Sequence, residues 1–478
     1  MKRRWIGVTV AAVATLAIVG GALAARVMAP RILVGAVFPL SGNAAGLAGE
    51  ELRGVQLAAD LVNADGGVGG RRIELDVRDL ASGEQAPAVM AALRADGVTT
   101  VIGAYSSDLS VPASAAAAAE GLVYWEAGAV ADRLTGRGLP LVFRVGASGT
   151  NLGTSSAAFA VGQLAPRLGR TPAELRVAIV NAQDDYATSV ADAAALTVTA
   201  AGAPIVARLS YDLVVPGFAD LVTTLAAARP DVLILASHIP DGIAFRQAML
   251  AAGLHVGALI GTTMAECDPD FAGALGADAV GVFASDRPVG GFRPGALDPA
   301  ARAVYDRFAT AWARATTAAQ VRTNAGHNAT LGWKAAGPST EWTDAGAGTY
   351  PGAAGPATTG AVTTGSTITG PPSALPWNGP TEEGISGFTA AWALFHDVLP
   401  SAVGGGAEAI AAAARTVDLP EGSLPNGAGL RFSSDPATLG QNVRAAAVIW
   451  QWQAVRSYTY VWPPTYATGT VVDVPLTR

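Results

Sequence analysis

The chain has 478 residues, of which 50% are hydrophobic and 14% charged, so its composition fits a folded protein of two or three domains and excludes a disordered polyelectrolyte. The formal net charge is −7 and the lysines are Lys2 and Lys334, which leaves no basic surface for nucleic acid. The single cysteine, Cys267, excludes an intramolecular disulfide and a cysteine-based zinc or iron–sulfur site.

Residues 1–25 have the layout of an export signal. Met1-Lys-Arg-Arg4 is a basic start, residues 6–25 are uncharged and mostly apolar, and Ala22-Leu23-Ala24 is a small-x-small cleavage site. The apolar run is also just long enough to span a bilayer. We therefore expect the remaining chain to be exported, either periplasmic or at the cell surface, and either free or tethered by residues 6–25.

Strands and helices are expected to alternate over residues 31–145. Residues 31–40 form a continuous apolar run typical of a strand buried on both faces, and residues 47–63 carry apolar side chains at helical spacing. The glycines within residues 66–70 end that helix and turn the chain. The pattern continues with strands at 73–77, 98–103, 122–125 and 141–145 and helices at 86–95 and 111–119.

The same alternation starts again after residue 145. We expect strands at 176–181, 205–209, 231–236, 259–261 and 279–283, and helices at 188–201, 218–227 and 243–252. Strands joined by single-helix crossovers pair in parallel, with helices on both faces of the sheet. Two such sets predict an α/β protein of two doubly wound parallel-sheet lobes.

Residues 323–381 interrupt the alternation. Gly, Thr, Ala, Ser and Pro dominate this stretch, which therefore buries little and is expected to be a low-complexity surface insertion. A lid or a partner-binding loop is the functional alternative. A helix at 387–399 and strands at 445–452 and 458–462 are expected after it.

Most catalytic motifs are absent. The sequence has no G-x-S-x-G, H-E-x-x-H, C-x-x-C or G-x-x-x-x-G-K-[ST] motif, and its four histidines lack the spacing of metal ligands. The glycines at 66–70 follow a helix and precede a strand, which is the reverse of a dinucleotide cradle. We expect no metal and no cofactor.

Polar side chains gather where predicted strands end, and in doubly wound sheets ligands bind at that edge. Ser106 and Ser107 precede a helix whose free N–H groups and dipole favour a carboxylate, although a plain helix cap is the alternative. Other strand ends supply an aromatic ring, hydroxyls, an imidazole and carboxylates: Tyr105, Glu126, Ala129, Asp184, Tyr186, His238, Thr263 and Glu266. Such a set suits a small polar or zwitterionic solute.

A run of motifs in order resembles one known family, the periplasmic solute-binding proteins of the leucine/isoleucine/valine type. The first are Ile32–Leu40 with Ser41-Gly42, then Gly54-x-Gln-Leu-Ala-x-Asp60, then Asn63–Arg71 with Asp79. Val101–Ser107, Pro112–Ser114, Arg144-Val145, Asp184–Tyr186 and Phe245–Ala248 continue the match. The resemblance covers about 31–315 and, more weakly, 386–460.

The resemblance implies the type 1 periplasmic binding protein fold, with two lobes joined by a multi-strand hinge. Lobe 1 is assigned residues 31–146 and 286–443, and lobe 2 residues 147–285 and 444–478. It also implies a non-enzymatic, monomeric substrate-binding protein of an ABC importer. Such a protein captures a branched-chain or other amino acid, or an amide- or urea-like solute, by hinge closure and delivers it to membrane permease subunits.

The resemblance also assigns roles to site residues. Ser107 and backbone amides would hold the ligand carboxylate, with a second contact from Ala129 and Val130. Tyr186 would close over the ligand, and His238 stands where relatives carry an aromatic residue. The acidic partner for a ligand ammonium falls at Thr263 or Glu266.

Three departures from the family pattern leave the solute open. Leu47 stands where amino-acid binders often have tyrosine, and Val130 replaces a hydroxyl residue. Glu126 resembles the acidic loop of amide- and urea-binding relatives. Two other classes remain: a membrane-anchored sensor of the same fold, and a hydrolase that uses Glu126 or Asp184 with a cleft water.

Overall fold

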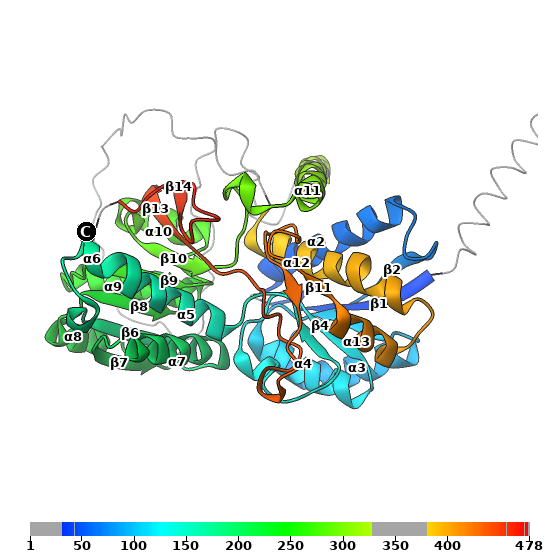
Figure 1. The fold of residues 1–478 in the computed structure, drawn as a ribbon, viewed down its shortest axis with the longest axis horizontal. Helices are drawn as coiled ribbons and strands as arrows, with labels where there is room; N and C mark the ends of the chain where they lie inside the picture. The colour runs from blue at the N-terminus through cyan, green and yellow to red at the C-terminus, as the bar shows by residue number, and fades with distance from the viewer. Residues whose placement is uncertain (1–30, 43, 327–379, 456, 473, 477–478) are drawn as a thin grey trace, which may run out of the picture.

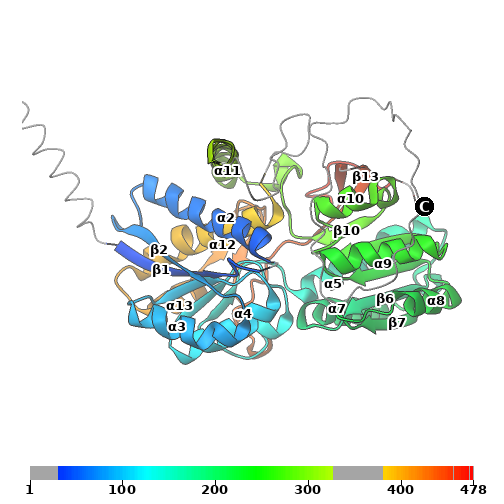
Figure 2. The same cartoon turned by 180° about the vertical axis from the view of Figure 1, so that it is seen from behind.

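The computed structural model describes residues 31–42, 44–326, 380–455, 457–472 and 474–476. These residues form two α/β lobes that lie side by side (Figures 1 and 2). The predicted leader or anchor, residues 1–25, and most of the predicted insertion lie outside the described residues. Among the helices that are described, none combines the length and the apolar character needed to span a bilayer.

Lobe 1 contains a five-stranded parallel sheet in the order β2-β1-β3-β4-β5. Its strands are β1 (Arg31–Phe38), β2 (Arg72–Asp79), β3 (Thr100–Gly103), β4 (Val123–Glu126) and β5 (Val142–Arg144). Every residue of β3, β4 and β5 is buried, as the continuous apolar runs predict for strands covered on both faces. A short hairpin-like pair, β11 (Asp418–Leu419) and β12 (Leu430–Arg431), lies apart from this sheet.

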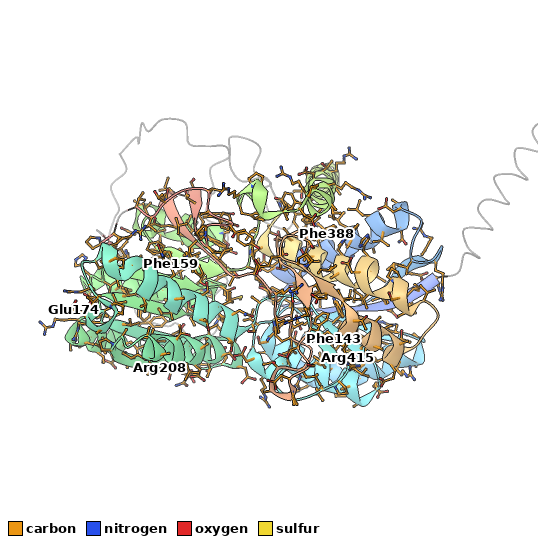
Figure 3. The ribbon with its side chains drawn as sticks, in the orientation of Figure 1. Phe143, Phe159, Glu174, Arg208, Phe388 and Arg415 are labelled. Carbon is orange, nitrogen blue, oxygen red and sulfur yellow. The ribbon has the colours of Figure 1, made fainter. Side chains whose placement is uncertain are left out.

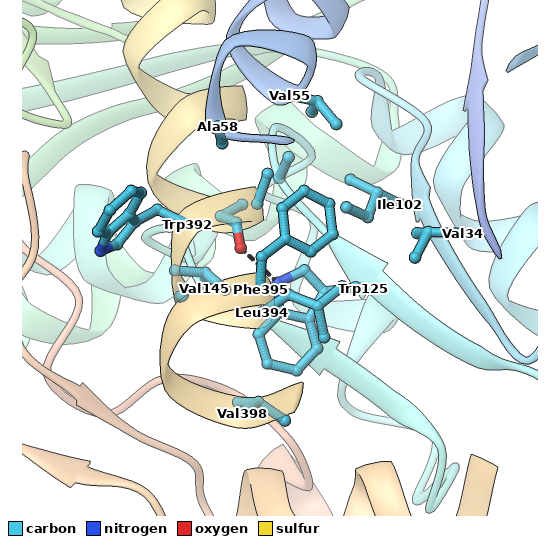
Figure 4. Packing of buried hydrophobic residues seen from close by; sticks show 14 of the residues in the cluster. Val34, Val55, Ala58, Ile102, Trp125, Val145, Trp392, Leu394, Phe395 and Val398 are labelled. Carbon is cyan, nitrogen blue, oxygen red and sulfur yellow. Dashed lines mark hydrogen bonds between the residues drawn. The ribbon is translucent and has the colours of Figure 1, made fainter. Parts of the chain in front are cut away.

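Helices cover both faces of the lobe 1 sheet. One face carries α2 (Ala45–Ala64), α12 (Glu382–Trp392) with its π-helical continuation (Ala393–Val398), and α13 (Ala407–Thr416); α11 (Pro299–Gly326) packs beside α2. The other face carries α3 (Ala86–Ala95) and α4 (Ser107–Ala119). Across the first interface Trp125 Nε1 donates a hydrogen bond of 2.8 Å to the Ala390 carbonyl (Figure 4). On the same side Arg415 lies 5.7 Å from the ring of Phe143 (Figure 3).

Lobe 2 contains a seven-stranded sheet in the order β14-β13-β10-β9-β8-β6-β7. Its strands are β6 (Val177–Ala182), β7 (Ile205–Tyr211), β8 (Val232–Ala236), β9 (Ala258–Thr262), β10 (Phe283–Asp286), β13 (Val448–Ala454) and β14 (Ser457–Trp462). Five of them pair in parallel, but β13 is antiparallel to both β10 and β14. The expected parallel sheet thus spans five strands, and the two strands predicted after the insertion add an antiparallel edge in which a short hairpin joins β13 to β14.

Helices also cover both faces of the lobe 2 sheet. One face carries α5 (Gly149–Phe159), a π-helical turn (Ala160–Leu164), α6 (Ala165–Arg167) and α7 (Asp185–Ala200). The other carries α8 (Phe218–Ala228), α9 (Ile239–Ala251) and α10 (Pro269–Leu275). Short 3₁₀ turns lie at Gly83–Gln85, Asp132–Leu134, Pro172–Glu174, Gly276–Ala279, Pro294–Ala296, Leu399–Ala402 and Pro436–Thr438.

One predicted strand is misplaced. The apolar run 279–283 begins in a 3₁₀ turn, and the strand itself spans Phe283–Asp286. Gly281 adopts a φ of +94° and turns the chain, so pairing with β9 starts only at Phe283, opposite Ile260. Helices α5, α10, α11 and α13 were not predicted.

Three segments cross between the lobes: β5 to α5, β10 to α11, and the segment that leads from β12 to β13. Two of them are tied together where they pass. The amide of Asn442 donates to the Arg144 carbonyl at 3.0 Å, and its side-chain Nδ2 donates to the Val145 carbonyl at 2.9 Å. Gln441 Nε2 donates to the Gly146 carbonyl at 3.1 Å. The lobes are thus joined by a multi-strand hinge.

Candidate functional site

A small cavity lies between the two lobes, at the carboxyl ends of the parallel strands. Its volume is about 60 Å³. Lobe 1 and lobe 2 both line it, together with one residue of a crossing segment: Tyr105, Ser106, Ser107, Asp108, Gly128, Ala129, Val130, Asp184, Tyr186, His238, Thr263, Met264, Arg287 and Glu382. A cavity between two lobes at the carboxyl ends of parallel strands is where α/β folds bind small solutes.

The start of α4 forms the lobe 1 wall. Ser106 occupies the N-cap position with an extended backbone, but its side chain makes no capping hydrogen bond, so the plain-cap interpretation is wrong for this serine. Ser107 Oγ accepts a hydrogen bond from the Ala131 amide at 3.1 Å, which leaves its own proton available for a ligand. The amide groups and dipole at this helix start favour an anion.

Glu126 fixes the backbone of the loop that follows β4. One carboxylate oxygen, Oε1, accepts hydrogen bonds from the amides of Gly128 and Ala129, both at 2.8 Å. Burial raises the pKa of Glu126 to about 7, against the lowering effect of these hydrogen bonds. Glu126 does not line the cavity; it holds the backbone that presents Ala129 and Val130 there.

Tyr186 closes the lobe 2 wall with its ring. Its hydroxyl lies 3.0 Å from the Ser237 carbonyl and 2.5 Å from the Thr262 carbonyl, so the hydroxyl proton is engaged by backbone acceptors of lobe 2. Its ring meets His238 edge-on, with centroids 5.2 Å apart. Tyr186 therefore lines the cavity and holds the ends of β8 and β9 together.

His238 lies between two carboxylates. Its Nε2 is 3.3 Å from Asp184 Oδ2 and its Nδ1 is 3.7 Å from Asp241 Oδ2. Burial lowers the pKa of His238, but the hydrogen bond with Asp241 and the charge of Asp184 outweigh it and hold the pKa above its usual value. Asp241 is in turn fixed by the Tyr211 hydroxyl. This wall thus combines an imidazole whose pKa is raised with an adjacent carboxylate.

Thr263 and Glu266 point to different places. Thr263 lines the cavity, whereas Glu266 is fully buried and its Oε2 accepts from Ser237 Oγ at 3.4 Å. A Cβ on Gly261 would lie 2.2 Å from that carboxylate, which shows how closely Glu266 packs on β9. Burial raises the pKa of Glu266 to about 8. Leu47 likewise packs against the lobe 1 core and does not line the cavity.

Unusual backbone conformations gather at this cavity. Four non-glycine residues in the described part of the chain have positive φ, and three of them line it: Tyr105 at 79°, Thr263 at 49° and Met264 at 56°. Such conformations are costly for residues with a Cβ and cluster at functional sites. The sequence carries no signal for them, because these residue types give no warning of a left-handed backbone.

Sequence reasoning placed eight of eleven candidate residues on the cavity and missed three charged ones, Asp108, Arg287 and Glu382. The Arg287 guanidinium donates to the Gly128 carbonyl at 2.7 Å through Nη1 and contacts Glu382 Oε1 at 2.5 Å through Nη2. Arg287 lies on a crossing segment, and Glu382 starts the helix that follows the low-complexity stretch. Neither belongs to a local motif, so only the fold brings them to the site.

The cavity contains no metal-ligand set. In the ranges that the structure describes, no three His, Cys, Asp or Glu residues are grouped so that they could hold a metal ion. Among the charged residues that line the cavity, Arg287 pairs with Glu382, and His238 lies 3.3 Å from Asp184. The site can therefore bind a small polar molecule through hydrogen bonds and charge.

Two doubly wound lobes, a multi-strand hinge and a cavity at the facing strand ends define a bilobal binding protein. The chain belongs to the periplasmic binding protein family, whose model matches residues 31–357.

The particular relatives are binding proteins named for branched-chain amino acids. The Leu/Ile/Val-binding protein homolog 8 of Brucella abortus is 34% identical over 254 residues, which are 53% of this chain and 63% of that protein. Homolog 7 of Brucella melitensis is 32% identical over 250 residues, 52% of this chain and 63% of that protein. The chain thus matches somewhat less than two thirds of the length of these curated relatives.

Solved structures share the fold at lower identity. The substrate-binding protein LivJ of Streptococcus pneumoniae in complex with isoleucine matches with a TM-score of 0.61 and 17% identity, covering 91% of this chain and 100% of that one. A solute-binding protein of R. palustris in complex with benzoate matches with a TM-score of 0.59 and 16% identity, covering 94% and 100%. These likenesses establish the type 1 periplasmic binding protein fold.

Proposed function

We propose that this protein is the extracytoplasmic substrate-binding protein of an ABC importer and that it captures a small polar solute, a branched-chain or other amino acid or an amide-like molecule. The observation that carries the proposal is the inter-lobe cavity, with an anion-favouring helix start and Ser107 on one wall and His238 with Asp184 on the other. Family membership and the Leu/Ile/Val-binding relatives support it.

Capture works by hinge closure in this proposal. The rigid bodies are the predicted lobes, residues 31–146 with 286–443 and residues 147–285 with 444–478. A ligand that contacts both walls stabilises the closed form because its binding free energy differs between the open and closed states. The closed monomer then docks on the permease subunits of the importer.

The carboxylates near the cavity favour binding over hydrolysis. Glu126 is hydrogen-bonded to two backbone amides, and Asp184 caps α7 and pairs with His238. A hydrolase needs a carboxylate positioned to activate water beside a nucleophile or a metal. Glu126 is instead held by the backbone, and Asp184 by the start of α7 and by His238.

Binding should be visible as thermal stabilisation. A ligand at 100 times its dissociation constant adds about 2.7 kcal/mol to the free energy of unfolding. We expect a thermal-shift screen of amino acids, short amides, urea and small carboxylates to give at least one such shift. Replacing Ser107 with alanine should then weaken binding of that solute about tenfold or more by calorimetry, since it removes a donor and leaves the Ala131 amide unpaired.

The matched control is Ser401→Ala, which removes the same hydroxyl from an exposed position off the cavity. It should leave affinity unchanged. Wild-type affinity in Ser107→Ala would remove this serine from the site, and a flat response to every solute in the screen would contradict the proposal.

We also propose that the protein is exported and released. The sensor alternative requires residues 6–25 to remain as an anchor. N-terminal sequencing of the protein from the expressing cells separates the two: a start near Ala25 or Arg26 supports a free binding protein, whereas an intact Met1 in the membrane fraction supports the anchored sensor.

A further inference from the structure

An amino acid needs a negative partner for its ammonium group, and three carboxylates line the cavity: Asp108, Asp184 and Glu382. If the bound solute is an amino acid, as in the proposed function, one of these three carboxylates accepts its ammonium group. Glu382 is engaged, because its Oε1 contacts Arg287 Nη2 at 2.5 Å and accepts from Ser386 Oγ at 3.1 Å. Asp108 is exposed in the first turn of α4, where water screens its charge.

Asp184 differs from both. Its side chain is 9% exposed, and Oδ1 accepts a hydrogen bond from the Ala187 amide at 2.7 Å, which fixes the carboxylate at the start of α7. The other oxygen, Oδ2, is buried and accepts no hydrogen bond within the described residues, although His238 Nε2 lies 3.3 Å from it. A buried acceptor without a donor is costly, and a ligand N–H group would remove that cost.

His238 and the Ala187 amide hold Asp184 in place, and burial leaves its pKa above the usual value. His238 Nε2 lies 3.3 Å from Oδ2, and His238 is itself held by Asp241. Burial raises the pKa of Asp184, while the charge of His238 and the Ala187 amide lower it. His238 is thus a positioning residue for the carboxylate.

We propose that Asp184 Oδ2 receives the ammonium group of an α-amino acid whose carboxylate lies at Ser107 and the start of α4. The anion-favouring wall belongs to lobe 1 and Asp184 belongs to lobe 2, so the two charges of one zwitterion bridge the cleft. A solute with only one of these charges contacts only one wall through a charged group. The protein therefore selects α-amino acids over amine-free carboxylates of the same shape.

Calorimetry with matched pairs of solutes tests this selection. The pairs are L-leucine with 4-methylpentanoate, L-isoleucine with 3-methylpentanoate, and L-alanine with propanoate. In wild-type protein we expect the amino acid of a bound pair to bind more tightly. In Asp184→Asn we expect about a thirtyfold or greater loss for the amino acid, and little change for the amine-free partner.

The variant is chosen to keep the fold. Asparagine caps helices as well as aspartate does, so Asp184→Asn retains the start of α7 and removes only the charge. Asp185→Asn makes the same change at the neighbouring residue, which does not line this cavity, and should leave the preference intact. Binding of the amine-free partner reports that the site in Asp184→Asn is still formed.

The outcomes separate the two proposals. If wild type binds an amino acid and Asp184→Asn keeps the same preference for it, the role of Asp184 is overturned and the binding function stands. If wild type binds none of the three amino acids and an amine-free carboxylate binds instead, amino-acid recognition by the cavity and the role of Asp184 both fail.

Discussion

Replacing Arg287 with methionine is expected to lower the free energy of unfolding by about 3–5 kcal/mol at pH 8, because it leaves buried carboxylates without their cation. Arg287 is 7% exposed, contacts Glu382 at 2.5 Å and lies 3.6 Å from Asp286. Glu51 adds a further buried carboxyl whose charge acts on this guanidinium. Methionine preserves most of the volume, so the loss measures charge. Urea unfolding of the two proteins checks it.

The loss should be smaller at pH 5 than at pH 8. Burial raises the pKa of Glu382 to about 7 even with Arg287 beside it, and raises that of Glu51 well above 4.5. Between pH 4.5 and 7 the folded protein therefore binds protons that the unfolded chain has released, and stability falls as pH rises. In Arg287→Met these pKa values rise further, because the guanidinium charge that lowers them is gone. The free energy of unfolding of the variant therefore continues to fall at pH values above 7, where ionising the buried carboxyls costs it more than it costs the wild type.

Arg293→Met is the control for this variant, since Arg293 lies exposed in the same crossing segment. It should change the free energy of unfolding by less than about 0.5 kcal/mol at either pH. An equal loss for Arg287→Met at pH 5 and pH 8 would show that packing, and not charge, is what the guanidinium supplies.

Gly54→Ala is expected to destabilise the protein by about 3 kcal/mol, because α2 and α12 touch through their backbones at this point. A Cβ at Gly54 would lie 2.1 Å from the Gly384 carbonyl oxygen and 2.6 Å from the Phe388 amide nitrogen. Phe388 is already stacked on Phe308, with centroids 4.1 Å apart, so α12 has little room to yield. Thermal and urea unfolding measure the effect.

Gly49→Ala in the same helix is the matched control. Nothing lies within 4 Å of a Cβ built there, so alanine should be neutral or add up to about 1 kcal/mol through helix propensity. Because α12 also carries Glu382, Gly54→Ala should weaken ligand binding as well. Equal stability of the two variants would show that α12 moves away freely.

The fold was largely predictable because the central strands of both sheets, such as β3, β4, β8 and β9, are buried on both faces. Apolar runs such as the one at 31–40 permit no other placement, and the helices between them follow from periodicity and turn glycines. Two local features were not predicted. The turn at Gly281 displaces the strand expected at 279–283. The antiparallel edge formed by β13 and β14 depends on a hairpin and not on a helical crossover.

The site was predictable only where it follows strand ends. Ser107, Tyr186 and His238 each come directly after a buried strand, so topology alone brings them to the cleft. Glu126 and Glu266 follow strands too, but the structure turns their carboxylates inward, which residue type does not reveal. Arg287 and Glu382 reach the cavity from a crossing segment and from a helix that follows a featureless stretch.

The covering of the lobe 1 sheet by α12 and α13 has a consequence for how the chain acquires its structure. The sheet is complete in sequence by Arg144, yet Trp125 and Phe143 remain uncovered on one face until residues 382–416 are available (Figure 4). Contacts between such distant segments form late, because a long loop must close first. Most of lobe 2 lies in the sequence between the two segments that form lobe 1. Synthesis therefore begins with lobe 1, but lobe 1 can bury its core only after most of lobe 2 has been made.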